Sequence, residues 1–302
     1  MGGRIFKDTS NIFAIDYGDI VQVGGKSYLI KGHEREDRFG LDEPKFWVKK
    51  AVDVDTGERK ILKLSFFETF EASIGDLKIP CFRNPEKEGA VLNLVGNHPY
   101  FMHGSQHSDT KGNNVRVLDV VKGINFYRYI ESITMDHERY FHELLPDILQ
   151  KLIKAFDALR ILHKAGFRHG DVRNDHIIIE QGTGNYVWID FDYDYDLAEN
   201  PFSLDLIGIG NILLYSIGKG FHNLKEREQG GLVYQELISK AERDDFSIIH
   251  KWRFMNLKKL YPYIPNNLND ILRHFTYGAS IFYESVDEVL EDLNRCITPK
   301  FS

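Results

Sequence analysis

The sequence is poor in cysteine, carries no excess of positive charge and has no long apolar run. Its two cysteines, Cys81 and Cys296, form no Cys-x-x-Cys pair, which argues against a disulfide framework or a thiolate metal site and fits a reducing compartment. The formal net charge is −7, so no basic field would draw the chain to nucleic acid or an anionic membrane. No stretch approaches the roughly 18 apolar residues of a membrane span, and residues 1–8 lack the apolar run of a secretion signal. These absences predict a cytoplasmic protein without nucleic-acid or membrane partners.

The apolar content is high enough for a large core. The chain has 302 residues, of which 42% are hydrophobic and 13% aromatic. A chain of this length and composition is expected to fold as two lobes or one large domain rather than to remain disordered.

One stretch, residues 169–176, is rich in the charged and polar residue types that are common in catalytic sites. It reads His-Gly-Asp-Val-Arg-Asn-Asp-His, and two short apolar runs, 177–179 and 187–189, follow it. The glycines between these runs predict a hairpin, with Asp171 just before its first strand and Asp190 just after its second. Two such carboxylates suit phosphoryl transfer, in which one orients or deprotonates a hydroxyl and the other holds magnesium on the nucleotide phosphates.

The first 70 residues predict an antiparallel sheet. Gly24-Gly25 separates two alternating runs and predicts a two-residue hairpin, and a second hairpin is expected from 45–53 and 58–66. Residues 32–44 lie between these hairpins and are expected to form a loop. A strand is expected at 115–123.

Helices are predicted mainly in the second half of the chain. In the first half, Asn84-Pro85 has the chemistry of a helix start, and Gly96 that of its end. Apolar residues at helical spacing predict a core helix over 146–162. Further helices are expected over 200–215, 267–272 and 285–293.

The order of these features resembles the protein kinase superfamily, in particular a bacterial-type serine/threonine kinase-like protein with divergent motifs. The resemblance covers roughly residues 28–293 and depends on five positions that arrive in the family's order: Lys63, Glu88, Asp171, Asp190 and Asp205. It implies an α+β, bilobal protein kinase-like fold. Residues 1–25 would be an N-terminal extension with an extra strand, 26–121 a small antiparallel β lobe with one helix, and 122–302 a larger, mainly helical lobe.

The resemblance also implies roles for individual residues, with ATP and Mg²⁺ or Mn²⁺ as cofactors and a protein as substrate or partner. Catalytic roles fall to Asp171, as the base that orients the hydroxyl, and to Arg173, which would neutralise the transferred phosphoryl group. Lys63 would position the phosphates and is expected to be paired with Glu88, for which Glu86 is the alternative. Backbone groups of Asp119 and Val121, in the hinge, would bind adenine. Asp190 would bind the metal, and Asp205 would hydrogen-bond the backbone of the catalytic loop.

Several departures from the family pattern keep other functions open. The glycine-rich G-x-G-x-x-G loop is absent, and Ile61 stands where the adenine pocket usually has a small residue. These departures fit a pseudokinase that acts as a binding or scaffold module. Gly170 before Asp171 resembles small-molecule kinases of the aminoglycoside and choline kinase type, for which segment 221–263, with Trp252 and Phe254, is the candidate lining of an acceptor pocket.

His176 occupies the position of the family's second metal-binding asparagine. It is predicted either to ligate a metal, with manganese preferred over magnesium, or to hydrogen-bond the loop backbone. The carboxylates Asp192, Asp194 and Asp196 would recruit a cation or form a solvated acidic edge. Because only ten residues separate Asp190 from Pro201, the Lys63–Glu88 pair is expected to form without a phosphorylated activation segment.

Overall fold

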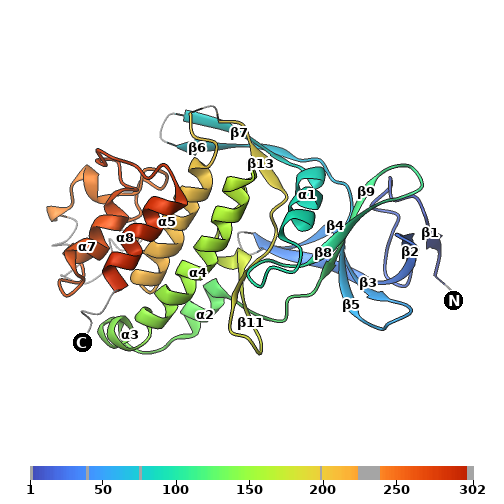
Figure 1. The fold of residues 1–302 in the computed structure, drawn as a ribbon, viewed down its shortest axis with the longest axis horizontal. Coiled ribbons are helices and arrows are strands. Elements are labelled where there is room, and N and C mark those ends of the chain that lie inside the picture. The colour runs from blue at the N-terminus through green and yellow to red at the C-terminus, as the bar shows by residue number, and fades with distance from the viewer. Residues whose placement is uncertain (1–2, 39–40, 75–76, 198, 224–238, 298–302) are drawn as a thin grey trace. The chain divides into compact units, whose positions relative to one another are not determined.

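The computed structural model describes residues 3–38, 41–74, 77–197, 199–223 and 239–297. The fold is mixed α+β, with seven α-helices in the described residues, one large mixed sheet and two small sheets (Figure 1). None of the helices in these ranges combines the length and apolar character that a membrane crossing needs.

The chain divides into two compact units. Unit 1 comprises Met1–Thr69, Phe82–Lys122 and Asp192–Asp194, and unit 2 comprises Phe70–Cys81, Gly123–Phe191 and Tyr195–Ser302. The chain passes from unit 1 into unit 2 after Lys122, one residue beyond the predicted division between 121 and 122. The structure assigns residues 70–81 and 192–194 differently from the sequence-based division.

Unit 1 contains a seven-stranded sheet in the order β1-β2-β3-β4-β5-β9-β8. The strands β1 and β2 are parallel, so the expectation of a purely antiparallel sheet is wrong at this edge. Gly24 and Gly25, with φ of 61° and 76°, form the predicted turn between β2 and β3, a conformation that favours glycine. The strands are β1 (Ile5–Phe6), β2 (Ile20–Val23), β3 (Lys26–Arg38), β4 (Leu41–Asp53), β5 (Arg59–Lys63), β8 (Gly104–Ser108) and β9 (Asn114–Asp119).

Residues 32–38 and 41–44, where a loop was expected, continue strands β3 and β4. β3 and β4 pair as far as Arg38 and Leu41, with register shifts near Gly32 and between His33 and Glu34. The shifts absorb the irregularity without ending the ladder. The expectation of a loop is therefore wrong for these described residues.

The N-terminal segment contributes to the core of unit 1. Ile12 and Ile15 are buried with apolar residues of β2 to β5 and β9. The buried ammonium of Lys49 donates to the carbonyl oxygens of Ile12 and Ile15 at 2.8 and 2.6 Å. The described part of the predicted extension, residues 3–25, thus supplies the strands β1 and β2 and contributes Ile12 and Ile15 to the core.

Helix α1 (Pro85–Val95) begins and ends where the sequence predicts. The Asn84 side chain accepts a hydrogen bond from the backbone N–H of Lys87 at 3.0 Å, which caps the first turn. Gly96 follows the last turn and donates its N–H to the Leu92 carbonyl oxygen at 3.1 Å.

Unit 2 is mainly helical. Figure 1 shows α4 (Leu145–Lys164), α5 (Ser203–Ile217) and α8 (Val286–Ile297) packed together, and the inward residues of α4 are buried at helical spacing. The other helices are α2 (Phe126–Ser132), α3 (His137–Glu143) and α7 (Asn266–Arg273). The predicted hairpin is present as β11 (Ile177–Glu180) and β12 (Tyr186–Trp188), which join β10 (Gly123–Asn125) in one small sheet. The other small sheet joins β13 (Tyr193–Tyr195), β7 (Leu77–Arg83) and β6 (Thr69–Ile74).

Candidate functional site

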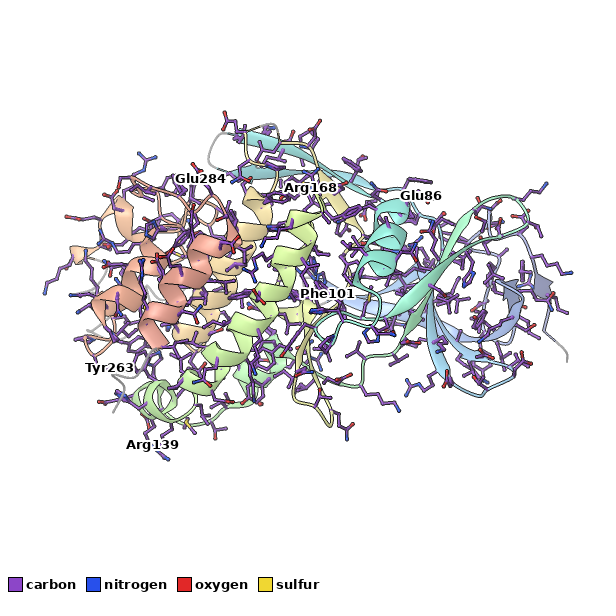
Figure 2. The ribbon with its side chains drawn as sticks, viewed as in Figure 1. Glu86, Phe101, Arg139, Arg168, Tyr263 and Glu284 are labelled. Carbon is purple, nitrogen blue, oxygen red and sulfur yellow. The ribbon has the colours of Figure 1, made fainter. Side chains whose placement is uncertain are left out.

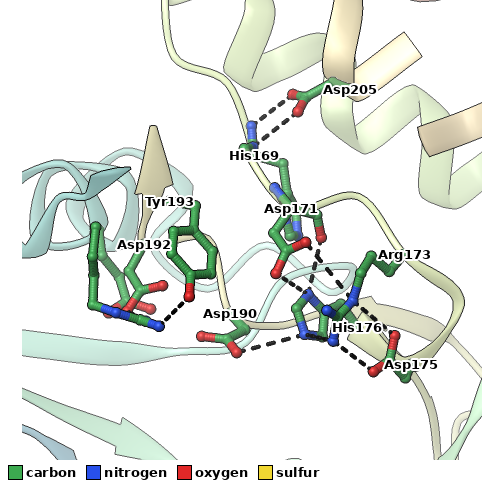
Figure 3. A network of polar contacts seen from close by, with 12 residues as sticks. His169, Asp171, Arg173, Asp175, His176, Asp190, Asp192, Tyr193 and Asp205 are labelled. Carbon is green, nitrogen blue, oxygen red and sulfur yellow. Dashed lines mark hydrogen bonds and ion pairs between the residues drawn. The ribbon is translucent and has the colours of Figure 1, made fainter. Parts of the chain in front are cut away.

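The backbone of the 169–176 loop is fixed by Asp205, near the start of α5. Its carboxylate accepts hydrogen bonds from the N–H groups of His169 at 2.7 Å and Gly170 at 2.8 Å (Figure 3). The His163 ring at the end of α4 is 2.9 Å from the same carboxylate. The predicted contact between Asp205 and the loop is therefore confirmed.

The electrostatics of Asp205 keep it charged. Burial alone would raise its pKa, but the hydrogen bond and charge of His163, the charge of His169 and the N–H of Gly170 lower it below the ordinary value. A charged, fully buried carboxylate with these partners holds the loop in one conformation.

The backbone conformation at position 170 explains why the residue before Asp171 is a glycine. Its φ is 86°, in the left-handed region that side-chain-bearing residues rarely adopt. An arginine at this position would be strained in this backbone conformation.

Asp171 lies in a partly closed environment, with 18% of its side chain exposed. Burial raises the pKa of its carboxyl above the ordinary value. The charges of His176 and Arg173 lower that pKa and those of Asp190 and Asp175 raise it, with a net increase. A carboxylate of raised pKa is a stronger proton acceptor.

Asp190 follows β12 and has a left-handed backbone, with φ of 64°. Such a conformation is uncommon in residues other than glycine and is concentrated at functional sites. Its Oδ2 lies 3.6 Å from Nε2 of His176, and Nδ1 of the same ring lies 3.4 Å from Oδ2 of Asp171. The structure thus places His176 next to both predicted carboxylates (Figure 3).

The two nitrogens of His176 are in use. Nδ1 is 2.9 Å from the carbonyl oxygen of Asp171, so this nitrogen is assigned the proton. Nε2 then accepts from Nη2 of Arg173 at 3.1 Å. The predicted backbone hydrogen bond is present, and a metal at Nε2 would have to replace Arg173. The ligand role of His176 stays a prediction.

Arg173 makes its closest contacts with Asp175. Its Nε and Nη2 donate to the two carboxylate oxygens of Asp175 at 3.0 and 2.7 Å. This bidentate geometry fixes the plane of the guanidinium group, and 42% of the Arg173 side chain remains exposed. To neutralise a phosphoryl group, as predicted, Arg173 would use its exposed part or exchange partners.

In unit 1, Lys63 and Glu88 form the predicted ion pair. The Lys63 ammonium lies 2.8 Å from Oε1 of Glu88, and both side chains are buried. Arg116 on β9 donates from Nε to Oε2 of Glu88 at 3.0 Å. The alternative, Glu86, is exposed on α1 and accepts from Gln106 (Figure 2), so it takes no part in this pair.

Asp192 is an internal ion-pair partner. Its Oδ2 lies 2.5 Å from Nη1 of Arg83 and 3.4 Å from the Lys63 ammonium, and the side chain is fully buried. Asp194 accepts from the Asn84 side chain at 3.3 Å, and Asp196 is exposed. The solvated-edge interpretation is therefore wrong for Asp192.

The predicted hinge follows β9. The N–H of Asp119 donates to the carbonyl oxygen of His103 at 2.9 Å, and its carboxylate accepts from Lys60 at 2.7 Å. The adenine contacts predicted for Asp119 and Val121 would use the other backbone groups of this segment, and they stay predictions.

Segment 221–263 is described only in part, because residues 224–238 lie outside the described residues. Phe254 is fully buried against Ala241, Phe246 and Leu260, so it belongs to the core. The Trp252 side chain is about half exposed. An acceptor pocket for a small molecule in this segment stays an untested expectation.

No protein-family model and no curated protein matches the chain.

Three polar residues that contact predicted site residues were not predicted from the sequence: Arg83, Arg116 and His163. A signal existed for Arg116, because an arginine within the apolar run 115–121 requires a buried partner. Arg83 and His163 have no comparable local signal.

Proposed function

We propose that the chain is an ATP-dependent phosphotransferase with a bilobal protein kinase-like fold that acts on serine or threonine hydroxyls of a protein. The observation that carries the proposal is Asp171: a carboxylate of raised pKa, on a loop fixed by Asp205, in the same network as Asp190. The proposed reaction also uses the Lys63–Glu88 pair of unit 1.

Asp171 would accept the proton of the attacking hydroxyl and orient that hydroxyl. Its raised pKa supports this role, because a general base is most efficient when its pKa lies near the pH at which the reaction runs. Arg173, two residues later, would place positive charge near the transferred group.

Lys63 would hold the α and β phosphates of ATP. Its ammonium is oriented by Glu88, and Glu88 is itself held by Arg116, so the lysine is positioned before nucleotide arrives. Preorganised charge of this kind costs little reorganisation during the reaction.

The donor atoms fit a hard divalent ion at Asp190. Carboxylate oxygen is a ligand that Mg²⁺ prefers, and the Asp190 side chain is 18% exposed. The ion, when bound, would neutralise charge on the phosphates. His176 fits less well in this arrangement, because its Nε2 accepts from Arg173.

The decisive variant is Asp171→Asn. We expect it to reduce transfer of labelled phosphate to a protein acceptor, or to the chain itself, by at least about a hundredfold, because general-base catalysis is worth that much. ATP binding, measured by thermal shift with Mg²⁺ or Mn²⁺, should be nearly unchanged. Asp147→Asn is the matched control, since Asp147 is an exposed residue of α4 in the same unit. Equal transfer by both variants would refute the role of Asp171.

The second candidate is a pseudokinase that serves as a binding module. The observation in its favour is that residues 32–38 and 41–44, where the family has its glycine-rich loop, form paired strands without the G-x-G-x-x-G pattern. It predicts that millimolar ATP with Mg²⁺ or Mn²⁺ leaves the melting temperature unchanged, because a ligand of the native state must raise it. A clear increase counts against the pseudokinase.

A further inference from the structure

Unit 1 contains a series of alternating charges, buried except at Glu68, that extends beyond the Lys63–Glu88 pair. From one end to the other, carboxylates and cations alternate, and each lies within 3.4 Å of the next. The series is Glu68, Arg83, Asp192, Lys63, Glu88 and Arg116. Its formal charges sum to zero, so each buried charge has an opposite neighbour.

Arg83 lies at the centre of the part of this series that the phosphotransfer roles do not use. One arm of its guanidinium donates to Asp192 at 2.5 Å, and the other donates to Glu68 at 3.1 Å and to the Tyr193 hydroxyl at 2.5 Å. The group also lies over the rings of Trp47 and Tyr193, 5.0 and 4.2 Å from their centroids. These contacts fix the guanidinium in position and orientation.

Segment 192–194 is bound to the start of α1 by further hydrogen bonds. The backbone N–H of Asn84 donates to the Asp192 carbonyl oxygen at 2.6 Å, and the Lys87 ammonium donates to the Tyr193 carbonyl oxygen at 2.5 Å. The Asn84 side chain donates to Asp194 at 3.3 Å. Arg83 immediately precedes Asn84, so the same short stretch makes the ionic and the backbone contacts.

Two carboxylates of unit 1 attract the Lys63 ammonium. It is 2.8 Å from Glu88 but 3.4 Å from Asp192, whose nearest oxygen is shared with Arg83. Removing the charge of Arg83 would strengthen the attraction of Lys63 to the buried Asp192 and draw it away from Glu88.

We infer that Arg83 is a positioning residue: by holding Asp192, it fixes segment 192–194 against the start of α1 and keeps Lys63 paired with Glu88 without an added phosphate. This inference describes the regulation of the proposed phosphotransfer site and rests on that function. The contacts that it invokes all lie in unit 1. The positioning role of Arg83 and the proposed phosphotransfer can therefore be tested separately.

The test is a double-mutant cycle of Arg83→Gln and Asp192→Asn, with amide hydrogen exchange at Asn84 as the readout and no nucleotide present. Hydrogen bonds to charged groups are strong enough that each single variant should speed this exchange by at least about tenfold. In the Asp192→Asn background, Arg83→Gln should add less than about twofold, because the two residues act as one unit. Arg4→Gln is the control: it removes an arginine–carboxylate pair with Asp19 elsewhere in unit 1 and should leave Asn84 unchanged.

A purely packing role for Arg83, on Trp47 and Tyr193, gives another result. Arg83→Gln would then have the same effect in both backgrounds, and this outcome overturns the inference. Should Arg83→Gln fail to fold, Asp192→Asn alone decides, since it leaves Arg83 bonded to Glu68 and Tyr193. Unchanged exchange at Asn84 in Asp192→Asn would overturn the inference.

The kinetic readout separates this inference from the proposed function. We expect Arg83→Gln to raise KM for ATP by about tenfold, as a displaced Lys63 weakens phosphate binding. An unchanged KM in a folded Arg83→Gln variant would overturn the inference while the proposed function stood. A parent protein that neither binds nor uses ATP would refute the function, and the exchange cycle would still report on Arg83.

Discussion

Arg116 holds Glu88 by the carboxylate oxygen that Lys63 does not use: its Nε donates to Oε2 at 3.0 Å, while Lys63 lies 2.8 Å from Oε1. Glu88 is therefore a shared anion for two buried cations. The position of Glu88 on α1 does not depend on the lysine alone.

Loss of this anion should destabilise unit 1. Glu88→Gln leaves Lys63 and Arg116 buried without their shared carboxylate, and we expect a loss of unfolding free energy on the order of 3 kcal/mol. Glu86→Gln makes the same chemical change at an exposed position two residues earlier and should alter stability by less than about 0.5 kcal/mol. Urea unfolding of both variants measures the difference. Similar midpoints for the two would contradict the shared-anion arrangement.

The raised pKa of Asp171 predicts the acid limb of the pH–rate profile. A base whose pKa is raised loses its charged form at a higher pH than an ordinary aspartate, so on acidification transfer should fall at a higher pH than an ordinary aspartate base would give. The same group should make the folded state bind more protons than the unfolded state in this range. Titration of the Asp171 carboxyl carbon by NMR measures the pKa directly, with exposed Asp147 as the reference. A pKa at or below that of Asp147 would contradict this prediction.

Buried Lys49 predicts a contribution to stability that rises in mild alkali. Burial lowers the pKa of its ammonium to about 8, despite the opposing charges of Asp16 and Asp19. Because the folded pKa is lower than the unfolded value, the unfolded chain keeps this proton between pH 8 and about 10.4 while the folded chain loses it, so the contribution of Lys49 to stability increases with pH. Burial raises the pKa of the Cys81 and Cys296 thiols, which acts in the opposite direction above about pH 8.5, so the contribution of Lys49 is measured as the difference between the parent and a variant without the ammonium.

Urea midpoints from pH 8 to about 9.5 test the Lys49 prediction. The midpoint of the parent relative to that of Lys49→Met should rise with pH across this interval, since the titrating group is absent from the variant. Lys50→Met, at the neighbouring and more exposed residue, should show the same pH dependence as the parent. A difference between the parent and Lys49→Met that does not change with pH would contradict the prediction.

His176 can be tested through its competition with Arg173. If Nε2 ligates the metal, manganese should support nucleotide binding better than magnesium, and His176→Asn should move the preference toward magnesium. Because Arg173 donates to this nitrogen, Arg173→Gln should strengthen the response to manganese. Thermal shift with ATP and each ion measures both effects. If the parent protein and His176→Asn prefer the same metal ion, the ring is not a metal ligand. Its role is then the hydrogen bond to the Asp171 carbonyl oxygen.

Local signals in the sequence were sufficient for the elements near the site. The Gly24-Gly25 turn, the Asn84 cap and the hairpin after Asp171 depend on neighbouring residues, and each is present. The contact of Asp205 with the 169–176 loop and the Lys63–Glu88 pair were predictable from the order of these residues, which resembles that of the protein kinase superfamily.

The contacts that sequence reasoning did not find join residues far apart in the chain. Arg83 and Asp192 are separated by 109 residues, and the alternation of Asp192, Asp194 and Asp196 pointed instead to a polar edge. Period-two spacing identifies a face of a strand but not what covers that face. The paired strands at 32–38 and 41–44 were missed because the position of this segment in the resembling family suggested a loop.

The two-residue strand β1 has a consequence for association between chains. An outer strand of a sheet exposes unpaired backbone groups to which another chain can add, and a very short strand limits that opportunity. Ile5 and Phe6 pair with Ile20 and Val21 and so cover that part of the edge of β2. Deleting these two residues would expose the backbone groups of Ile20 and Val21, to which a strand of another chain could add.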